Sequence, residues 1–154
     1  MTTACAPQIQ APDEPYRTVG RLLKQVTSSV IRGIDQRMQP YGLTAMQWEP
    51  MFLVASGKVD TVAALARESH VNCGAMTRML DRLEKKQLLR RRRSDSDRRV
   101  VHLELTPKGR RLVHRILPVA LEELRQHLKD FKPEEIEMLI SLLGRMLRNG
   151  VHDA

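Results

Sequence analysis

The sequence predicts a mainly α fold with a small β-hairpin wing, in which a winged helix-turn-helix core is flanked by N- and C-terminal dimerisation helices. Three observations predict it. Hydrophobic residues make up 42% of the chain and aromatic residues only 3%, so the core must be built from Leu, Val, Ile, Met and Ala, which favours helices. Apolar residues recur at helical spacing along most of the chain. The segment 101–105 instead alternates as a half-buried strand does.

The N-terminal part is predicted to be a disordered leader over residues 1–14, followed by a dimerisation helix within 15–42. Apolar residues between Val19 and Met38 form one stripe at helical spacing. Pro15 suits the first turn of a helix, and the sequence "PYG" at 40–42 ends it. The stripe is longer than one small winged domain can cover. We therefore expect a two-fold homodimer through the terminal helices, the alternative being packing within one chain.

Residues 43–106 are predicted to form the winged helix-turn-helix domain. Thr44 and Gln47 have the spacing of a capping box and begin a helix that runs to about Ala55. Pro50 should kink this helix and free the Met46 carbonyl. Two short helices follow, over 60–70 and 72–86, joined by a tight turn. The sequences "LLRRRR" and "RVVHLEL" then form a hairpin with "SDSD" at or near its tip.

Residues 107–154 are predicted to form the C-terminal dimerisation helices. Thr106 and Pro107 occupy the cap and first position of a long helix, which Pro118 should kink. Pro133, followed by two glutamates, begins the last helix, and Gly150 ends it. Both helices carry apolar stripes, as the N-terminal helix does.

Almost all of the excess positive charge lies between residues 85 and 115. This segment holds twelve Lys and Arg against three acids, whereas the rest of the chain holds fourteen against fifteen. Six of the ten residues in "RRRRSDSDRR", 90–99, are arginines, and they lie on a predicted hairpin instead of a tail. Positive charge focused beside a helix-turn-helix indicates double-stranded DNA as the partner. The alternative is a solvated face that only aids solubility.

Other classes of protein are disfavoured. No apolar run approaches the roughly 20 residues of a membrane span, and the start of the chain has no secretory signal, so we expect a cytoplasmic protein with no membrane partner. No nucleophile-elbow, P-loop or paired-carboxylate pattern predicts an enzyme. His114 and His127 lack metal-ligand spacing with any Cys or acid. Neither a metal nor a cofactor is expected.

The motifs in order resemble the MarR family of bacterial transcription regulators. The sequence "ALARESHVNCGAMTRMLDRLEKKQLLRRRRSDSDRRVVHLELTPKGRRL" is similar to the family's DNA-binding core, "DRR" at 97–99 to its D-x-R wing signature, and "LTPKG" to the entry of its fifth helix. "LTAMQW" at 43–48 resembles its second-helix entry, and the resemblance spans about 15–150. Many relatives have glycine before the recognition helix, where this chain has His70, and glycine at the C-terminus of that helix, where this chain has Gln87. Without the second glycine, the recognition helix should end less sharply.

The second helix of the motif is expected to enter the major groove. Arg78 can be bidentate to guanine, the alternative being an ion pair with Asp81 or Glu84, and Arg82 is expected to contact phosphate. Arg98 would insert into the minor groove, while the resemblance implies that Asp97 and Arg99 support the wing. The predicted DNA-binding residues are Asn72, Cys73, Gly74, Ala75, Thr77, Arg78, Arg82, Asp97, Arg98 and Arg99.

The resemblance also implies a small aromatic acid as a ligand, bound between the DNA lobe and the dimer helices. An aromatic ring with cationic neighbours suits an aromatic carboxylate, and Trp48 is the single Trp of the chain. The predicted ligand residues are Tyr16, Arg17, Arg21, Gln47, Trp48, Met51 and His70. The alternative is that Trp48 and Met51 are ordinary core.

The function expected from these observations is a repressor that an aromatic carboxylate releases from a pseudo-palindromic operator. Two alternatives stay open. Cys73, at a helix N-terminus near basic residues, could act as a redox sensor, because that position lowers the pKa of a thiol. The chain could also be a ligand-independent architectural DNA-binding protein.

Overall fold

The computed structural model describes residues 14–69, 71, 73–94, 97 and 99–150, excluding the Cys73 side chain. Its elements are α1 (Glu14–Met38), η1 (Gln39–Tyr41), α2 (Ala45–Ala55), α3 (Val62–Glu68), α4 (Cys73–Lys85), β1 (Leu89–Arg93), β2 (Val101–Leu105), α5 (Pro107–His127) and α6 (Pro133–Gly150). The leader, His70, Asn72 and Arg98 lie outside the described residues. The mainly α fold with a β-hairpin is confirmed, whereas the division into domains stays a prediction.

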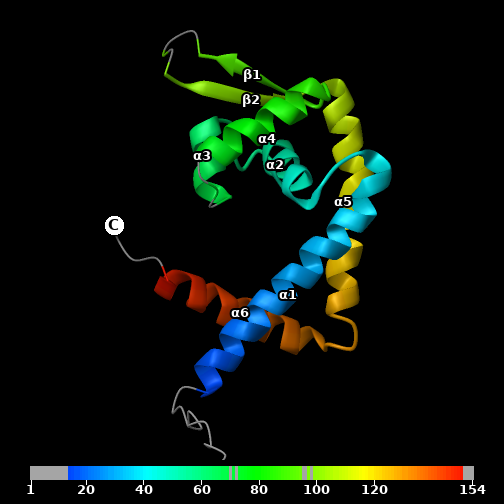
Figure 1. Cartoon of the computed structure of the whole chain (residues 1–154), viewed down its shortest axis with the longest axis vertical. Helices are drawn as coiled ribbons and strands as arrows, with labels where there is room; N and C mark the ends of the chain where they lie inside the picture. The colour runs from blue at the N-terminus through cyan, green and yellow to red at the C-terminus, as the bar shows by residue number, and fades with distance from the viewer. Residues whose placement is uncertain (1–13, 70, 72, 95–96, 98, 151–154) are drawn as a thin grey trace, which may run out of the picture.

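The molecule has a lobe of short elements and an arm of long helices. In Figure 1 the lobe holds α2, α3, α4 and the hairpin, and α5 runs from it alongside α1 toward α6 at the opposite end. The hairpin is antiparallel, with Leu89 opposite Leu105 and Arg93 opposite Val101. The middle of β2 is attached to the segment before α3, because the Leu103 N–H donates to the Asp60 carbonyl at 2.8 Å. The wing is therefore an ordered part of the lobe, as its alternating sequence predicted.

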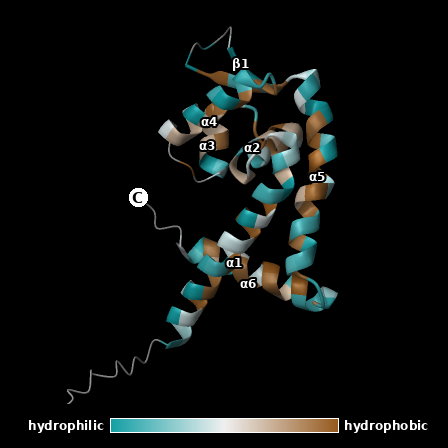
Figure 2. Ribbon diagram, turned by 45° about the vertical axis from the view of Figure 1, so that its right-hand side comes forward, coloured by the Kyte–Doolittle hydropathy of each residue, from teal (hydrophilic) through white to brown (hydrophobic). Residues whose placement is uncertain are grey.

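The hydrophobic core is confined to the lobe and to the parts of α1 and α5 that reach it. The buried residues of α1 are Ile34 and Met38 near its C-terminus, and those of α5 end at Ala120. No residue of α6 is buried. Figure 2 shows hydrophobic segments continuing along the arm beyond this core. The arm thus carries apolar surface that a single chain does not cover.

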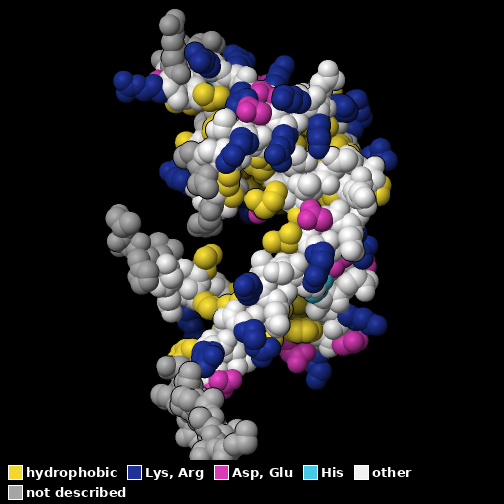
Figure 3. All heavy atoms as spheres, in the orientation of Figure 1, with side chains coloured by type: hydrophobic (Ala, Val, Ile, Leu, Met, Phe, Trp, Pro, Cys, Tyr) yellow, Lys and Arg dark blue, Asp and Glu magenta, His cyan; other side chains and the backbone are white. Residues whose placement is uncertain are grey.

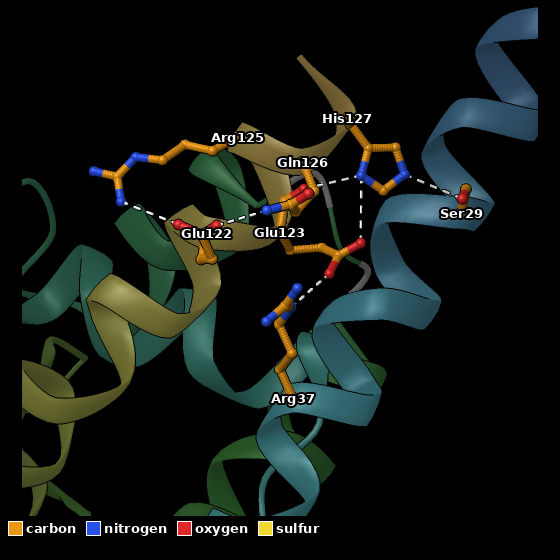
Figure 4. A network of polar contacts seen from close by, with 7 residues as sticks. All are labelled: Ser29, Arg37, Glu122, Glu123, Arg125, Gln126 and His127. Atoms are coloured by element: carbon orange, nitrogen blue, oxygen red, sulfur yellow. Dashed lines mark hydrogen bonds and ion pairs between the residues drawn. The ribbon is translucent and has the colours of Figure 1, made fainter. Parts of the chain in front are cut away.

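A polar network joins α1 to α5 just beyond the core (Figure 4). Arg37 Nε donates to Glu123 Oε2 at 2.6 Å, and His127 lies between Glu123 and Ser29, with Nε2 3.1 Å from Ser29 Oγ. Gly33 provides the space, because a Cβ there would lie 2.1 Å from Glu123 Oε1. Directional bonds of this kind fix the register of two helices more narrowly than apolar packing does.

The start of α2 differs from the predicted capping box. Thr44 is the N-cap residue but makes no side-chain capping bond. The Ala45 N–H donates instead to Asp35 Oδ1, at 2.6 Å, from α1. Gln47 is buried, and its amide oxygen accepts a hydrogen bond from Lys86 Nζ at 2.9 Å. The prediction was wrong because the Gln47 N–H donates to the Thr44 carbonyl and the Gln47 side chain is held by Lys86, so neither bond of a capping box forms.

The end of α4 is sharper than predicted. Gln87 adopts a left-handed conformation, with φ of 58°. Its N–H donates to the Glu84 carbonyl, and the N–H of Leu88 donates to the Leu83 carbonyl. This pair of bonds is the Schellman pattern that glycine usually completes. The chain therefore makes the cap with glutamine, at the cost of backbone strain.

Candidate nucleic-acid interface

Helix α4 has one buried face and one exposed face. Met76, Met79, Leu80 and Leu83 face the core. Its exposed residues are Gly74, Thr77, Arg78, Arg82 and Lys85. Because the N-terminal turns carry small side chains, the helix can approach a groove closely, with Arg78 and Arg82 on the same exposed side.

The acids of α4 are neutralised by the wing and not by Arg78. Arg91, on β1, donates through Nη2 to Asp81 Oδ1 at 2.5 Å and through Nε to Glu84 Oε2 at 2.9 Å. Its backbone N–H also donates to Glu84 Oε1 at 2.8 Å. The bonds to Glu84, and then to Asp81, hold the pKa of Arg91 above its ordinary value. Arg78 Nε instead lies 3.4 Å from the Gly74 carbonyl of its own helix.

A second wing arginine also holds a carboxylate of the protein. Arg90 pairs across the hairpin with Glu104, with its Nη2 2.5 Å from Oε2. This hydrogen bond lowers the pKa of the Glu104 carboxyl. Arg92 and Arg93 are exposed. Arg90 and Arg91, neighbours on opposite faces of the strand, thus both hold acids of the protein.

Asp97 organises the turn of the wing. Its Oδ1 accepts a hydrogen bond from the Arg99 N–H at 2.9 Å, and its carbonyl accepts one from the Val100 N–H at 2.9 Å. The Ser94 N–H donates to the Val100 carbonyl at 3.0 Å, which closes the hairpin. The aspartate of the "DRR" sequence therefore acts on the backbone of the turn, and Arg99 is exposed.

On the face of the lobe seen in Figure 3, basic side chains far outnumber acidic ones. Figure 3 shows Lys and Arg side chains spread over the lobe, with few acidic side chains among them. A winged helix-turn-helix with a cationic recognition helix, a cationic wing and internally neutralised acids is suited to bind a duplex polyanion.

Comparison with known proteins identifies the family. The MarR family model matches residues 43–101. The multiple antibiotic resistance protein MarR of Salmonella typhimurium is 30% identical over 130 residues, which are 84% of this chain and 90% of that protein. The chain belongs to the MarR family. Like other MarR-family members, it is a DNA-binding transcription regulator.

Further MarR-family comparisons cover nearly the whole chain. The regulator PecS of Dickeya dadantii is 29% identical over 91% of this chain and 86% of its own length. The crystal structure of a mutant MarR from E. coli complexed with operator DNA matches with a TM-score of 0.79 at 26% identity, covering 90% of this chain and 99% of that one. No helix within the described ranges is long and apolar enough to cross a membrane.

The structure does not bring the predicted ligand residues together in one chain. Tyr16 lies 22 residues before the C-terminal end of α1, or about 33 Å along the helix. Trp48 lies on α2, which begins beside that end, so Tyr16, Arg17 and Arg21 cannot face it. Met51 is fully buried, and Trp48 is half-buried with its ring 5.8 Å from that of Phe52. The interpretation of Trp48 and Met51 as core fits this packing, and the ligand site between the DNA lobe and the dimer helices stays a prediction.

A different hollow lies beside the recognition helix. It has a volume of about 480 Å³ and is lined by Thr61, Val62, Ala63, Ala66, Met76, Thr77, Arg91, Arg99, Val100 and Val101. The walls come from α3, α4 and the wing, and two arginines lie among mostly apolar side chains. Among the described residues, no group of three or more His, Cys, Asp or Glu side chains is arranged to hold a metal ion.

Sequence reasoning missed three residues that position the interface. Arg91 was not singled out among the four consecutive arginines, although Asp81 and Glu84 lie on the same side of α4 at i, i+3 spacing and required a partner. Lys86 and Asp35 were not singled out, because their partners lie 39 and 10 residues away in the chain. Only the role of Arg91 could have been predicted from the sequence, because the i, i+3 spacing of its two acidic partners is a local pattern.

Proposed function

We propose that the protein is a repressor that binds a pseudo-palindromic operator as a homodimer. The observation that carries this proposal is the neutralisation of Asp81 and Glu84 by Arg91. It leaves the exposed side of α4 to Arg78 and Arg82, without carboxylates that would repel a phosphate backbone. We therefore expect Arg78 to read a base edge and Arg82 to contact phosphate.

The DNA experiment uses a duplex that the wild-type protein selects from random-sequence DNA. Arg78→Ala should relax the sequence preference and cost roughly 1–3 kcal/mol of binding free energy. Arg82→Ala should weaken binding to all duplexes alike and lower the salt slope of log K. Arg98→Ala should also lower the salt slope of log K, because Arg98 is expected to contact the minor groove. The assignment fails if Arg78→Ala and Arg82→Ala alter sequence preference equally.

The homodimer is supported by the apolar surface of the arm. Ile140 and Leu147 of α6 are 66% and 62% exposed, and Val26 of α1 is 53% exposed. A monomer seldom leaves so much contiguous apolar surface in water. Ile140→Glu should give a monomeric mass by light scattering and lose operator affinity. Arg145→Glu, on the opposite side of α6, is the matched control and should stay dimeric.

A small aromatic carboxylate is proposed to release the DNA. The hollow between α3, α4 and the wing supports this, since it is mostly apolar with Arg91 and Arg99 among its walls. A ligand there must favour the arrangement that does not bind DNA, because equal affinity for both arrangements shifts nothing. Ala63→Leu should fill the hollow, so that a panel of phenolic carboxylates no longer reduces the gel shift. Full release of the variant from DNA would place the ligand elsewhere.

A further inference from the structure

A second cationic surface lies on α5, outside the recognition helix and the wing. It is a shallow hollow of about 580 Å³, lined by Pro40, Tyr41, Lys108, Arg111, Leu112 and Arg115. Lys108, Arg111 and Arg115, here called the α5 cluster, follow one side of the helix at i, i+3 and i+7. Three of the six lining residues are thus cations, and none is an acid.

No carboxylate among the described residues forms an ion pair with the α5 cluster. Arg90 and Arg91 of the wing are paired with carboxylates, and so are Arg37 and Arg125 of the arm. Within the described ranges, no ion pair joins Lys108, Arg111 or Arg115 to a carboxylate. Three cations held within two turns of one helix repel one another, and an external polyanion would remove that repulsion.

The α5 cluster is held in place by groups that connect it to α4. The Arg115 guanidinium lies over the Tyr41 ring, 5.7 Å from its centroid. Lys108 Nζ donates to the Lys86 carbonyl at 3.0 Å. Lys86 Nζ in turn donates to the Gly42 carbonyl at 2.5 Å and to Gln47 at 2.9 Å. These bonds tie the end of α4, the turn before α2 and the start of α5 into one surface.

Hydrogen bonds connect this surface to the exposed side of α4. Gln47, which binds Lys86, also lines a hollow with Arg78 and Arg82. Lys86 thus links that hollow, through Gln47, to Lys108 of the α5 cluster.

The spacing and openness of the cluster fit a phosphate backbone better than a small molecule. Arg115 lies seven residues after Lys108, a rise of about 10 Å along α5. One strand of a duplex presents a phosphate about every 3.4 Å along its axis, or roughly three over that length. Small-molecule sites are enclosed and mostly apolar, whereas this hollow is shallow and half of its lining residues are cations.

We propose that the α5 cluster binds the phosphate backbone of the duplex that α4 reads, at phosphates beyond those that the recognition helix and the wing contact. The inference rests on the proposed binding of an operator by this lobe. It assigns Lys108, Arg111 and Arg115 to sequence-independent affinity, and Tyr41 to the positioning of Arg115. The duplex is thereby held from three elements, namely α4, the wing and α5.

The test compares single arginine substitutions along one helix. Arg111→Gln and Arg115→Gln each remove one cation while keeping a good helix former. Each should lower the salt slope of log K by about 0.9 per half-site, or about fivefold in affinity per lost contact at 0.15 M salt. The loss should be equal on the selected duplex and on an unrelated duplex. Arg125→Gln, farther along α5 and paired with Glu122, is the matched control and should bind as the wild type does.

Two further measurements separate the proposal from a structural effect. Tyr41→Leu removes the ring but no charge, so affinity should fall with the salt slope unchanged. Phosphate-ethylation interference should lose signal in Arg111→Gln at phosphates distinct from those lost in Arg82→Ala. If both α5 variants bind with wild-type slope and affinity while Arg82→Ala is impaired, the α5 proposal is overturned and the operator proposal stands. If the wild type selects no duplex, the operator proposal itself fails.

Discussion

Gly109→Ala should destabilise the protein more than a methyl group added at Gly20 or Gly33. Gly109 lies in the first turn of α5, directly against the backbone of Leu88. A Cβ at this position would lie 1.9 Å from the Leu88 carbonyl oxygen and 2.9 Å from its carbonyl carbon. An ordinary contact between carbon and oxygen needs about 3.3 Å, so the two segments must separate by more than about 1 Å. Because both contacting groups are backbone, no side-chain rotation can relieve the overlap.

The magnitude follows from the bonds that this separation breaks. The Thr106 N–H donates to the Leu88 carbonyl at 3.1 Å, and the Thr106 hydroxyl accepts from the Gly109 N–H at 3.0 Å while donating to the Gln87 carbonyl at 2.7 Å. Loss of one backbone bond and one helix cap costs about 2 kcal/mol, and displacement of the buried Leu88 adds about 1–2 kcal/mol. The higher helix propensity of alanine offsets this loss of stability by up to about 1 kcal/mol. The net loss is about 2–3 kcal/mol.

The assay is urea unfolding at one fixed protein concentration, followed by helical circular dichroism. Gly20→Ala, in the interior of α1 with nothing within 4 Å of the added Cβ, is the control and should be stabilising. Gly33→Ala should fall between the two, because only the Glu123 side chain stands in its way. A Gly109→Ala variant as stable as the wild type would refute the reasoning, since the backbone would then have moved without cost.

Three other substitutions test single contacts. Gln87→Gly should raise the unfolding free energy by about 1 kcal/mol, measured in urea, because the exposed Gln87 side chain makes the left-handed φ of 58° costly. Arg91→Gln should lower it by about 1–2 kcal/mol and loosen the wing in hydrogen exchange, whereas the exposed Arg93→Gln should change stability little. Arg90→Gln should raise the pKa of Glu104 toward its ordinary value in an NMR titration; the wild-type pair stabilises the fold above about pH 4.5 and loses that contribution as the pH falls through the lowered pKa.

The parts of the fold that the sequence predicted well depend on local patterns. The hairpin follows from the alternation of Val101, Leu103 and Leu105 beside a polar turn, and α5 begins at Thr106 and Pro107 as their cap chemistry indicates. These signals lie within a few residues of the structure that they specify, so no tertiary contact is needed to interpret them.

The parts that could not be predicted depend on contacts between distant segments. The cap of α2 comes from Asp35 in another helix, and a pattern search finds only the local Thr44. The residues of the predicted ligand site illustrate the same limit. Tyr16 lies about 33 Å along α1 from the helix end beside which α2, with Trp48, begins. Whether α2 folds back along α1 or packs into the lobe depends on contacts between distant segments, and these the local sequence does not specify.

The bonds of Arg91 to Asp81 and Glu84 also determine how this regulator could be re-engineered. A chimera that replaces only α4, in order to change operator choice, would place new side chains opposite an arginine selected for two acids. If the donor helix lacks those acids, Arg91 loses its partners, and the β1 backbone N–H that binds Glu84 is left unpaired. The transferable unit is therefore 73–105, in which the helix and both strands of the wing are exchanged together.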